Sequence, residues 1–133
     1  MKKQNLEVKK KKVLVVDDDV DITRLVEKAL DKAGGYEVIS VNKPARALGL
    51  VRKHNPDLIL MDALMPVVNG TEIAMQLSRE NRFRNTPVIF ISSLLEGSDT
   101  GTTGKRIGGY MCLAKPFKPG DLLTCVEKTE RLQ

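Results

Sequence analysis

The sequence has few of the residues that define several protein classes. Its 133 residues include no tryptophan, two tyrosines, three phenylalanines and one histidine. So few aromatic side chains argue against a surface that stacks nucleic-acid bases. The two cysteines, Cys112 and Cys125, are too few for a disulfide scaffold and lack the spacing of metal ligands. We therefore expect both to be small core residues in a reducing compartment.

Long apolar runs are also missing. No stretch approaches the roughly 20 apolar residues of a membrane span. The lysine-rich start of the chain is not followed by the apolar region of a signal peptide. These absences predict a cytoplasmic protein without membrane association.

The net charge of +5 comes from one end of the chain. Residues 1–12 hold six lysines and one glutamate, and the basic and acidic residues beyond Lys12 balance at sixteen each. The folded part is therefore expected to be neutral, which argues against a direct nucleic-acid interface. We expect residues 1–11 to be a disordered basic leader, with phosphate or membrane-surface attraction as the open alternative, and residues 12–133 to be one domain.

Strand and helix signals alternate along the chain. Apolar runs predict strands near 12–17, 36–41, 57–62, 87–92 and 110–114, and helical patterns lie near 20–33, 44–54, 69–82, 98–107 and 119–131. Strict alternation predicts an α/β fold with a doubly wound parallel sheet. The weakest helix signal is 98–107, because glycine and threonine dominate 97–104. That segment also lacks the spacing of a nucleotide-binding phosphate loop.

Acidic residues follow two of the predicted strands. Asp17-Asp18-Asp19 comes directly after Val13–Val16, and Asp62 ends the run that begins at Leu58. Because the carboxyl ends of parallel strands meet at one edge of a sheet, these carboxylates should converge. Like charges at close range are costly unless a cation joins them. A third strand end supplies an ammonium group, that of Lys115.

These residues form a pattern that resembles a known family. The pattern comprises Asp17 and Asp18, Asp62 with Met65-Pro66 and Gly70 after it, Ser92 at the end of the fourth strand, and Lys115-Pro116-Phe117. In this order and near these spacings, it is similar to the receiver domain of two-component response regulators. The resemblance covers about residues 12–131 and implies the strand order 2-1-3-4-5.

The resemblance implies a phosphoacceptor and a metal site. Asp62 would accept the phosphoryl group, and Mg²⁺ would be held by Asp17, Asp18, Asp62 and the backbone carbonyl of Leu64, since this hard cation prefers oxygen ligands. In the family the second acid of the pair is the direct ligand, here Asp18, and Asp17 would act through water. A site shifted by one residue, to Asp18 and Asp19, stays open; otherwise Asp19 is a helix cap.

Two more residues would contact the phosphoryl group. Lys115 can pair with a phosphate oxygen, and the Lys115-Pro116 bond is cis in the family. The hydroxyl of Ser92 can donate to the phosphoryl group, and the family's switch pulls it inward. The family usually has Tyr or Phe where this chain has Cys112, and Tyr110 lies about two residue rises away. We therefore expect a switch region of Ser92 and Cys112 whose relay differs from the usual aromatic one.

The neighbours of the site bear on the lifetime and source of the phosphoryl group. Leu64 follows Asp62 by two residues and Leu94 follows Ser92 by two. Leucine side chains exclude water instead of orienting it, so we predict slow self-dephosphorylation. The one histidine, His54, has the features of an exposed helix C-terminus. The phosphodonor is then another protein, by resemblance a sensor histidine kinase or a phosphotransfer protein.

The sequence thus predicts a phosphorylation switch more than an enzyme, catalysing only its own phosphorylation and dephosphorylation. Its changing face would include the fourth helix, fifth strand and fifth helix, and would act on a downstream effector or on an output domain outside this sequence. Homodimerisation through that face is common in the family and stays open. Alternatives are a pseudo-receiver that binds proteins without phosphate chemistry and a haloacid-dehalogenase-like phosphatase. The phosphatase is disfavoured because Leu64 occupies the position of its acid/base aspartate.

Overall fold

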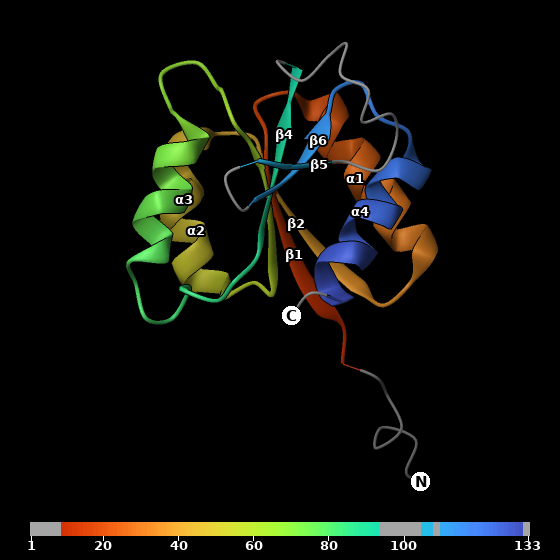
Figure 1. Cartoon of the computed structure of the whole chain (residues 1–133), viewed down its shortest axis with the longest axis horizontal. Coiled ribbons are helices and arrows are strands. Elements are labelled where there is room, and N and C mark those ends of the chain that lie inside the picture. The colour runs from red at the N-terminus through yellow and green to blue at the C-terminus, as the bar shows by residue number, and fades with distance from the viewer. Residues whose placement is uncertain (1–8, 94–104, 108–109, 132–133) are drawn as a thin grey trace, which may run out of the picture.

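The chain folds around one central sheet with helices on both faces. The computed structural model describes residues 9–93, 105–107 and 110–131. The strands lie in the order β2-β1-β3-β4-β6-β5. Figure 1 shows α2 and α3 on one side of the sheet and α1 and α4 on the other. In the described part of the chain no helix is long and apolar enough to cross a membrane.

Five of the strands are parallel. They are β1 (Lys11–Val16), β2 (Tyr36–Val41), β3 (Leu58–Asp62), β4 (Val88–Ser92) and β6 (Tyr110–Ala114). The helices are α1 (Val20–Ala33), α2 (Ala47–His54), α3 (Gly70–Ser78) and α4 (Pro119–Arg131), and a 3₁₀ turn, Pro44–Arg46, leads into α2. Counting β6 as the fifth parallel strand, the order 2-1-3-4-5 is confirmed. The doubly wound fold class is confirmed with it.

The segment expected to form a fourth helix contains a strand instead. Lys105–Ile107 is β5, which pairs antiparallel with β6 at the edge of the sheet. The helix prediction over 98–107 was therefore wrong for these three residues, and 98–104 lies outside the described residues. The outer edge of β6 would otherwise present unpaired N–H and C=O groups, and a neighbouring strand satisfies them.

Helix α3 is shorter than the predicted range of 69–82. It begins at Gly70, after Asn69, whose side chain accepts a hydrogen bond from the N–H of Thr71 at 2.9 Å. It ends at Ser78, and the chain then turns so that the ring of Phe83 is buried. The helical periodicity reveals neither this early end of the helix nor the burial of Phe83 after it.

Apolar side chains fill both faces of the sheet. On β1, Val13 and Val15 face the α1 and α4 side, whereas Leu14 and Val16 face α2 and α3, and all four are fully buried. Burying one such side chain contributes roughly 1.5–3 kcal/mol.

The two cysteines lie within these two clusters. Cys112 is buried on the α2 and α3 side and Cys125 on the α1 and α4 side, which confirms their prediction as core residues. Burial raises the pKa of the Cys125 thiol to about 11. A thiol with so high a pKa is poorly reactive at neutral pH.

His54 is the last residue of α2, as expected, and the left-handed Asn55 ends the helix with φ of 51°. The residue is partly buried, however, where an exposed residue was expected. The carbonyl of His54 accepts a bond from the Nζ of Lys12 at 3.3 Å. This contact ties the end of α2 to the start of β1.

The loop between β3 and α3 contains a strained residue. Val67 has φ of +71° and its side chain is fully exposed. A β-branched residue rarely adopts this conformation, at a cost of order 1–3 kcal/mol. We predict that Val67→Asn raises the free energy of unfolding by about 1 kcal/mol, because asparagine tolerates this region and no packing is lost. In urea unfolding, the free energy of unfolding should be highest with Asn at position 67, lower with Ala and lowest with Val. Equal stabilities of the three proteins would contradict strain at this position.

Candidate functional site

Three carboxylates converge at the carboxyl ends of β1 and β3. Asp17 follows β1 and Asp62 is the last residue of β3, and the two strands are hydrogen-bonded neighbours with Val16 opposite Met61. Carboxylate oxygens of Asp17, Asp18 and Asp62 lie within 4.8 Å of one another. The structure thus brings together the acids that the sequence placed at one sheet edge.

Asp17 is the most buried of the three. Its Oδ1 accepts a hydrogen bond from the N–H of Asp19 at 2.9 Å. Its Oδ2 is buried, and the Nζ of Lys115 makes an ion pair with it at 2.8 Å. Burial raises the pKa of Asp17, and the charge of Asp62 adds to this, while Lys115 and the Asp19 N–H oppose it. The site is therefore costly to keep ionised without a further cation.

Lys115 bridges two of these carboxylates. Its Nζ lies 2.8 Å from Oδ2 of Asp17 and 3.2 Å from Oδ2 of Asp62. Burial lowers the pKa of this ammonium, but the two carboxylates outweigh it and the pKa is raised. The Lys115-Pro116 peptide bond is cis, as the resemblance implied. Lys115 is thus held as a cation directly beside Asp62.

The donor set fits a hard divalent cation. It offers carboxylate oxygens from three residues, including the buried Oδ2 of Asp17. Asp18 is exposed, so its carboxylate can turn to a metal without breaking a contact. The shifted pair of Asp18 and Asp19 is less favoured, because Oδ1 of Asp19 caps α1 by accepting from the N–H of Asp21 at 2.9 Å.

The backbone around Asp62 also contributes to the site. Oδ1 of Asp62 accepts a bond from the N–H of Leu64 at 3.2 Å, and the Leu64 side chain is 53% exposed. The exposed fraction matters because this leucine follows the buried Asp62 by two residues and meets solvent there. Ser92, the last residue of β4, is buried on the neighbouring strand, and its carbonyl accepts from the N–H of Lys115 at 3.0 Å. The strand ends therefore bring Ser92 and Lys115 to the edge that carries Asp62.

Cys112, at the position expected to belong to a switch region, is a buried thiol. Cys112 on β6 lies opposite Phe90 on β4. The ring of Tyr110 packs edge-on against Phe90, with centroids 5.0 Å apart and planes at 70°. Edge-to-face pairs of this kind are stabilising. The ring of Tyr110 is thus engaged with Phe90 on the neighbouring strand, and that it does not replace the missing aromatic directly stays a prediction.

Two contributions to the site were missed by the sequence analysis. Gly70 was recognised as part of the family pattern, but its close approach to Asp62 was not foreseen: a Cβ there would lie 2.1 Å from the carbonyl oxygen of Asp62. Asn42 was not singled out, although its Nδ2 donates to the carbonyl of Asp17 at 2.9 Å. The only available signal for Asn42 was its place just after β2, the strand beside β1.

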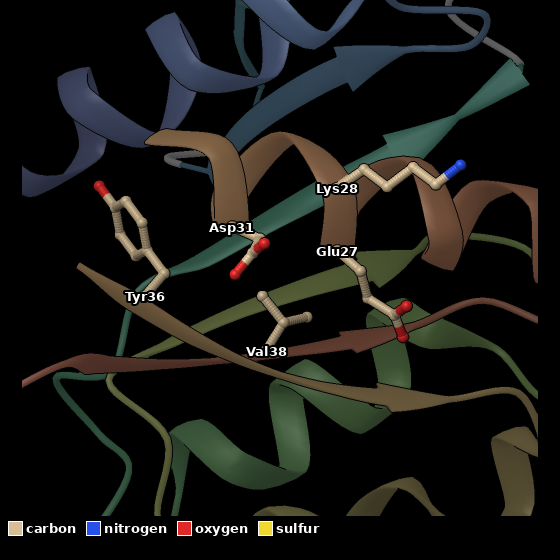
Figure 2. A pocket seen from close by; sticks show the side chains of 5 residues that line it. All are labelled: Glu27, Lys28, Asp31, Tyr36 and Val38. Atoms are coloured by element: carbon tan, nitrogen blue, oxygen red, sulfur yellow. The ribbon is translucent and has the colours of Figure 1, made fainter. Parts of the chain in front are cut away.

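A cavity of about 350 Å³ lies away from this edge, between α1 and β2. Figure 2 shows Glu27 and Asp31 of α1 pointing toward the strand, Lys28 pointing away, and Tyr36 and Val38 on β2. Oη of Tyr36 already donates to Oε1 of Glu130 at 3.1 Å. This cavity has no part in the carboxylate site.

Comparison with known proteins points to one family. Residues 13–127 match the family model described as the response regulator receiver domain. A probable transcriptional regulator, ycf27, of Porphyra purpurea is 37% identical over 117 residues, which are 88% of this chain and 46% of the relative. The phosphate regulon transcriptional regulatory protein PhoB of Pseudomonas aeruginosa is 32% identical over 113 residues, 85% of this chain and 48% of the relative. The chain spans about half the length of these curated relatives.

A solved structure agrees over nearly the whole chain. The chemotaxis response regulator CheY4 of Vibrio cholerae superposes with a TM-score of 0.76 at 32% sequence identity. The match covers 90% of this chain and 98% of CheY4. The similarity therefore extends to the full architecture of that protein.

Proposed function

The chain belongs to the response regulator receiver domain family of two-component systems, and from that premise we propose that it accepts a phosphoryl group on Asp62 beside a bound Mg²⁺. One observation carries the proposal: the carboxylates of Asp17, Asp18 and Asp62 lie within 4.8 Å of one another, with the Nζ of Lys115 at 3.2 Å from Asp62. A carboxylate flanked by a cation and by oxygen ligands for Mg²⁺ suits phosphoryl transfer.

The proposed step is an in-line displacement. A carboxylate oxygen of Asp62 attacks the phosphorus of the donor, the new P–O bond forms, and the bond to the leaving group breaks with its electron pair. When bound, Mg²⁺ supplies positive charge against the phosphoryl oxygens. Lys115 exchanges its ion pair with Asp62 for one with a phosphoryl oxygen, and Ser92 donates its hydroxyl to another.

The same proposal covers the partners. Receiver domains interact with kinases and effectors of two-component systems. For this chain we propose a sensor histidine kinase or phosphotransfer protein as donor and an effector or output domain as target, in the cytoplasm. The phosphoryl group adds roughly two negative charges, enough to reorder nearby hydroxyl and lysine contacts. The chain then acts as a switch that catalyses only its own phosphorylation and dephosphorylation.

Intact mass spectrometry after incubation with acetyl phosphate tests the proposal. We expect one added phosphoryl group that requires Mg²⁺ and is absent in Asp62→Asn. No adduct under conditions that phosphorylate a control receiver would contradict the proposal and favour a pseudo-receiver, which binds partners without phosphate chemistry.

The lifetime of the phosphoryl group should depend on Leu64. Its side chain is 53% exposed beside Asp62, and it can exclude water but not orient it. We predict that Leu64→Asn shortens the half-life of the phosphorylated protein by about tenfold, below the 10²–10⁴-fold of general acid–base catalysis because asparagine can orient water but does not take its proton. Leu94, the other leucine expected to matter, lies outside the described residues. Decay of the adduct, followed by mass, measures the half-life; Leu64→Met is the apolar control, and equal half-lives of all three proteins would refute this role.

A further inference from the structure

Asn42 holds the segment that carries two of the acids. Its Nδ2 lies 2.9 Å from the carbonyl oxygen of Asp17 and 3.0 Å from Oγ1 of Thr23. A side-chain amide has two N–H donors, so one nitrogen can serve both acceptors. The preceding residue, Val41, accepts the backbone N–H of Asp17 at 3.1 Å. Two consecutive residues at the end of β2 therefore fix both backbone polar groups of Asp17.

Asp18, the second of these acids, has no comparable contacts of its own among the described residues. The side chain of Asp18 is exposed, and it makes no hydrogen bond or ion pair with any residue for which the structure gives a position. The position of its backbone depends on the peptide group that joins it to Asp17. The oxygen of that peptide group is the one that accepts from Asn42. The backbone position from which the Asp18 carboxylate reaches the site is thus tied to Asn42 through one peptide plane.

Thr23 anchors the other side of Asn42. This threonine is 1% exposed, so its hydroxyl cannot exchange its partners for water. The hydroxyl donates to the carbonyl of Val20 at 3.1 Å and accepts from Asn42. A buried hydroxyl that both donates and accepts a hydrogen bond keeps one geometry, because losing either partner is costly. The amide of Asn42 is therefore held between the first turn of α1 and the carbonyl of Asp17.

We infer that Asn42 is a positioning residue for the proposed Mg²⁺ site, locking the peptide between Asp17 and Asp18 so that both carboxylates face the cation. The inference rests on the proposed function. Removing a residue that orients a metal ligand typically weakens metal binding by 10–100-fold. Asn42→Ala should therefore weaken Mg²⁺ binding by about tenfold although Asn42 touches no metal.

Titration of the metal-free protein with Mg²⁺ alone, followed by amide NMR shifts of Asp18 and Asp19, tests the inference. We expect the dissociation constant to rise about tenfold in Asn42→Ala and also in Asn42→Asp, which keeps the size but has no amide N–H. Thr23→Ser keeps the hydroxyl and should bind Mg²⁺ within about twofold of wild type. Thr23→Val removes the anchor and should lie between wild type and Asn42→Ala. Urea unfolding of each protein separates this effect from a loss of stability.

Each outcome decides a different question. A lowered stability of Asn42→Ala with an unchanged dissociation constant would show a merely structural residue and overturn the inference. Failure of the wild type to bind Mg²⁺, or binding that survives Asp18→Asn, would instead overturn the proposed metal site, and the inference with it. Weakened binding in both Asn42 variants, with normal binding in Thr23→Ser, would support the inference.

Discussion

Gly70→Ala is expected to lower the free energy of unfolding by about 3 kcal/mol, at the upper end of the usual cost of overpacking. A Cβ at this position would lie 2.1 Å from the carbonyl oxygen of Asp62 and 2.9 Å from Cγ of Met61. The nearest of these atoms is backbone, so rotation of a side chain cannot relieve the clash. Either α3 moves outward or the end of β3 moves, and the second response displaces the phosphoacceptor.

Gly49→Ala is the matched control for this prediction. Gly49 lies within α2, and a Cβ there would meet nothing within 4 Å. Alanine in a helix interior is favoured over glycine by roughly 1 kcal/mol, so this variant should be more stable than wild type. Urea unfolding should show that the free energy of unfolding falls in Gly70→Ala and rises in Gly49→Ala. A Gly70→Ala protein as stable as wild type would mean that α3 does not approach Asp62 as closely as described.

Asp17→Asn should reduce Mg²⁺ affinity by about 100-fold, the upper end of the 10–100-fold cost of altering a residue behind a direct ligand, because Asp17 is expected to act on the metal through water. The same change should stabilise the metal-free protein. Asp17 is fully buried, and its repulsion with Asp62 is among the causes that raise its pKa. Burial and repulsion both disfavour the ionised carboxylate, and the neutral amide of asparagine removes both costs.

Urea unfolding with and without Mg²⁺ measures both effects, because a ligand that binds only the native state stabilises it. Wild type should gain stability from Mg²⁺, and Asp17→Asn should not. Asp19→Asn is the control, since asparagine is an equally good helix cap and Asp19 is already used as the cap of α1. If Asp19→Asn lost the Mg²⁺ response while Asp17→Asn kept it, the metal site would lie one residue further along the chain.

The parts of this molecule that were predictable from sequence are those set by simple periodicity. Runs such as Leu58–Met61 are buried on both faces, and runs of that kind identify parallel strands. Once the strands are parallel, Asp17 and Asp62 must meet at the same edge. Convergence of the acids beside Lys115 therefore follows from the order of elements alone.

The parts that were missed depend on contacts between distant residues. Strand β5 is stabilised by hydrogen bonds to the edge of β6, and the local sequence Lys105–Ile107 does not predict that pairing. The close approach of Gly70 to Asp62 and the bond from Asn42 to Asp17 likewise arise only when helices and strands pack. The roles of Asp62 and Asp18 in phosphate chemistry are predictions that the experiments above test.

The central claim is that Asp62 itself forms the acyl phosphate, and mapping the modified residue tests it most directly. Borohydride reduces an aspartyl phosphate to homoserine, and trypsin places Asp62 in the peptide 54–79 and Asp17 and Asp18 in the peptide 13–24. After treatment with acetyl phosphate and Mg²⁺, fragmentation of peptide 54–79 should locate homoserine at position 62. Homoserine in peptide 13–24, or at no position while an acetyl phosphate adduct is present, would contradict the account.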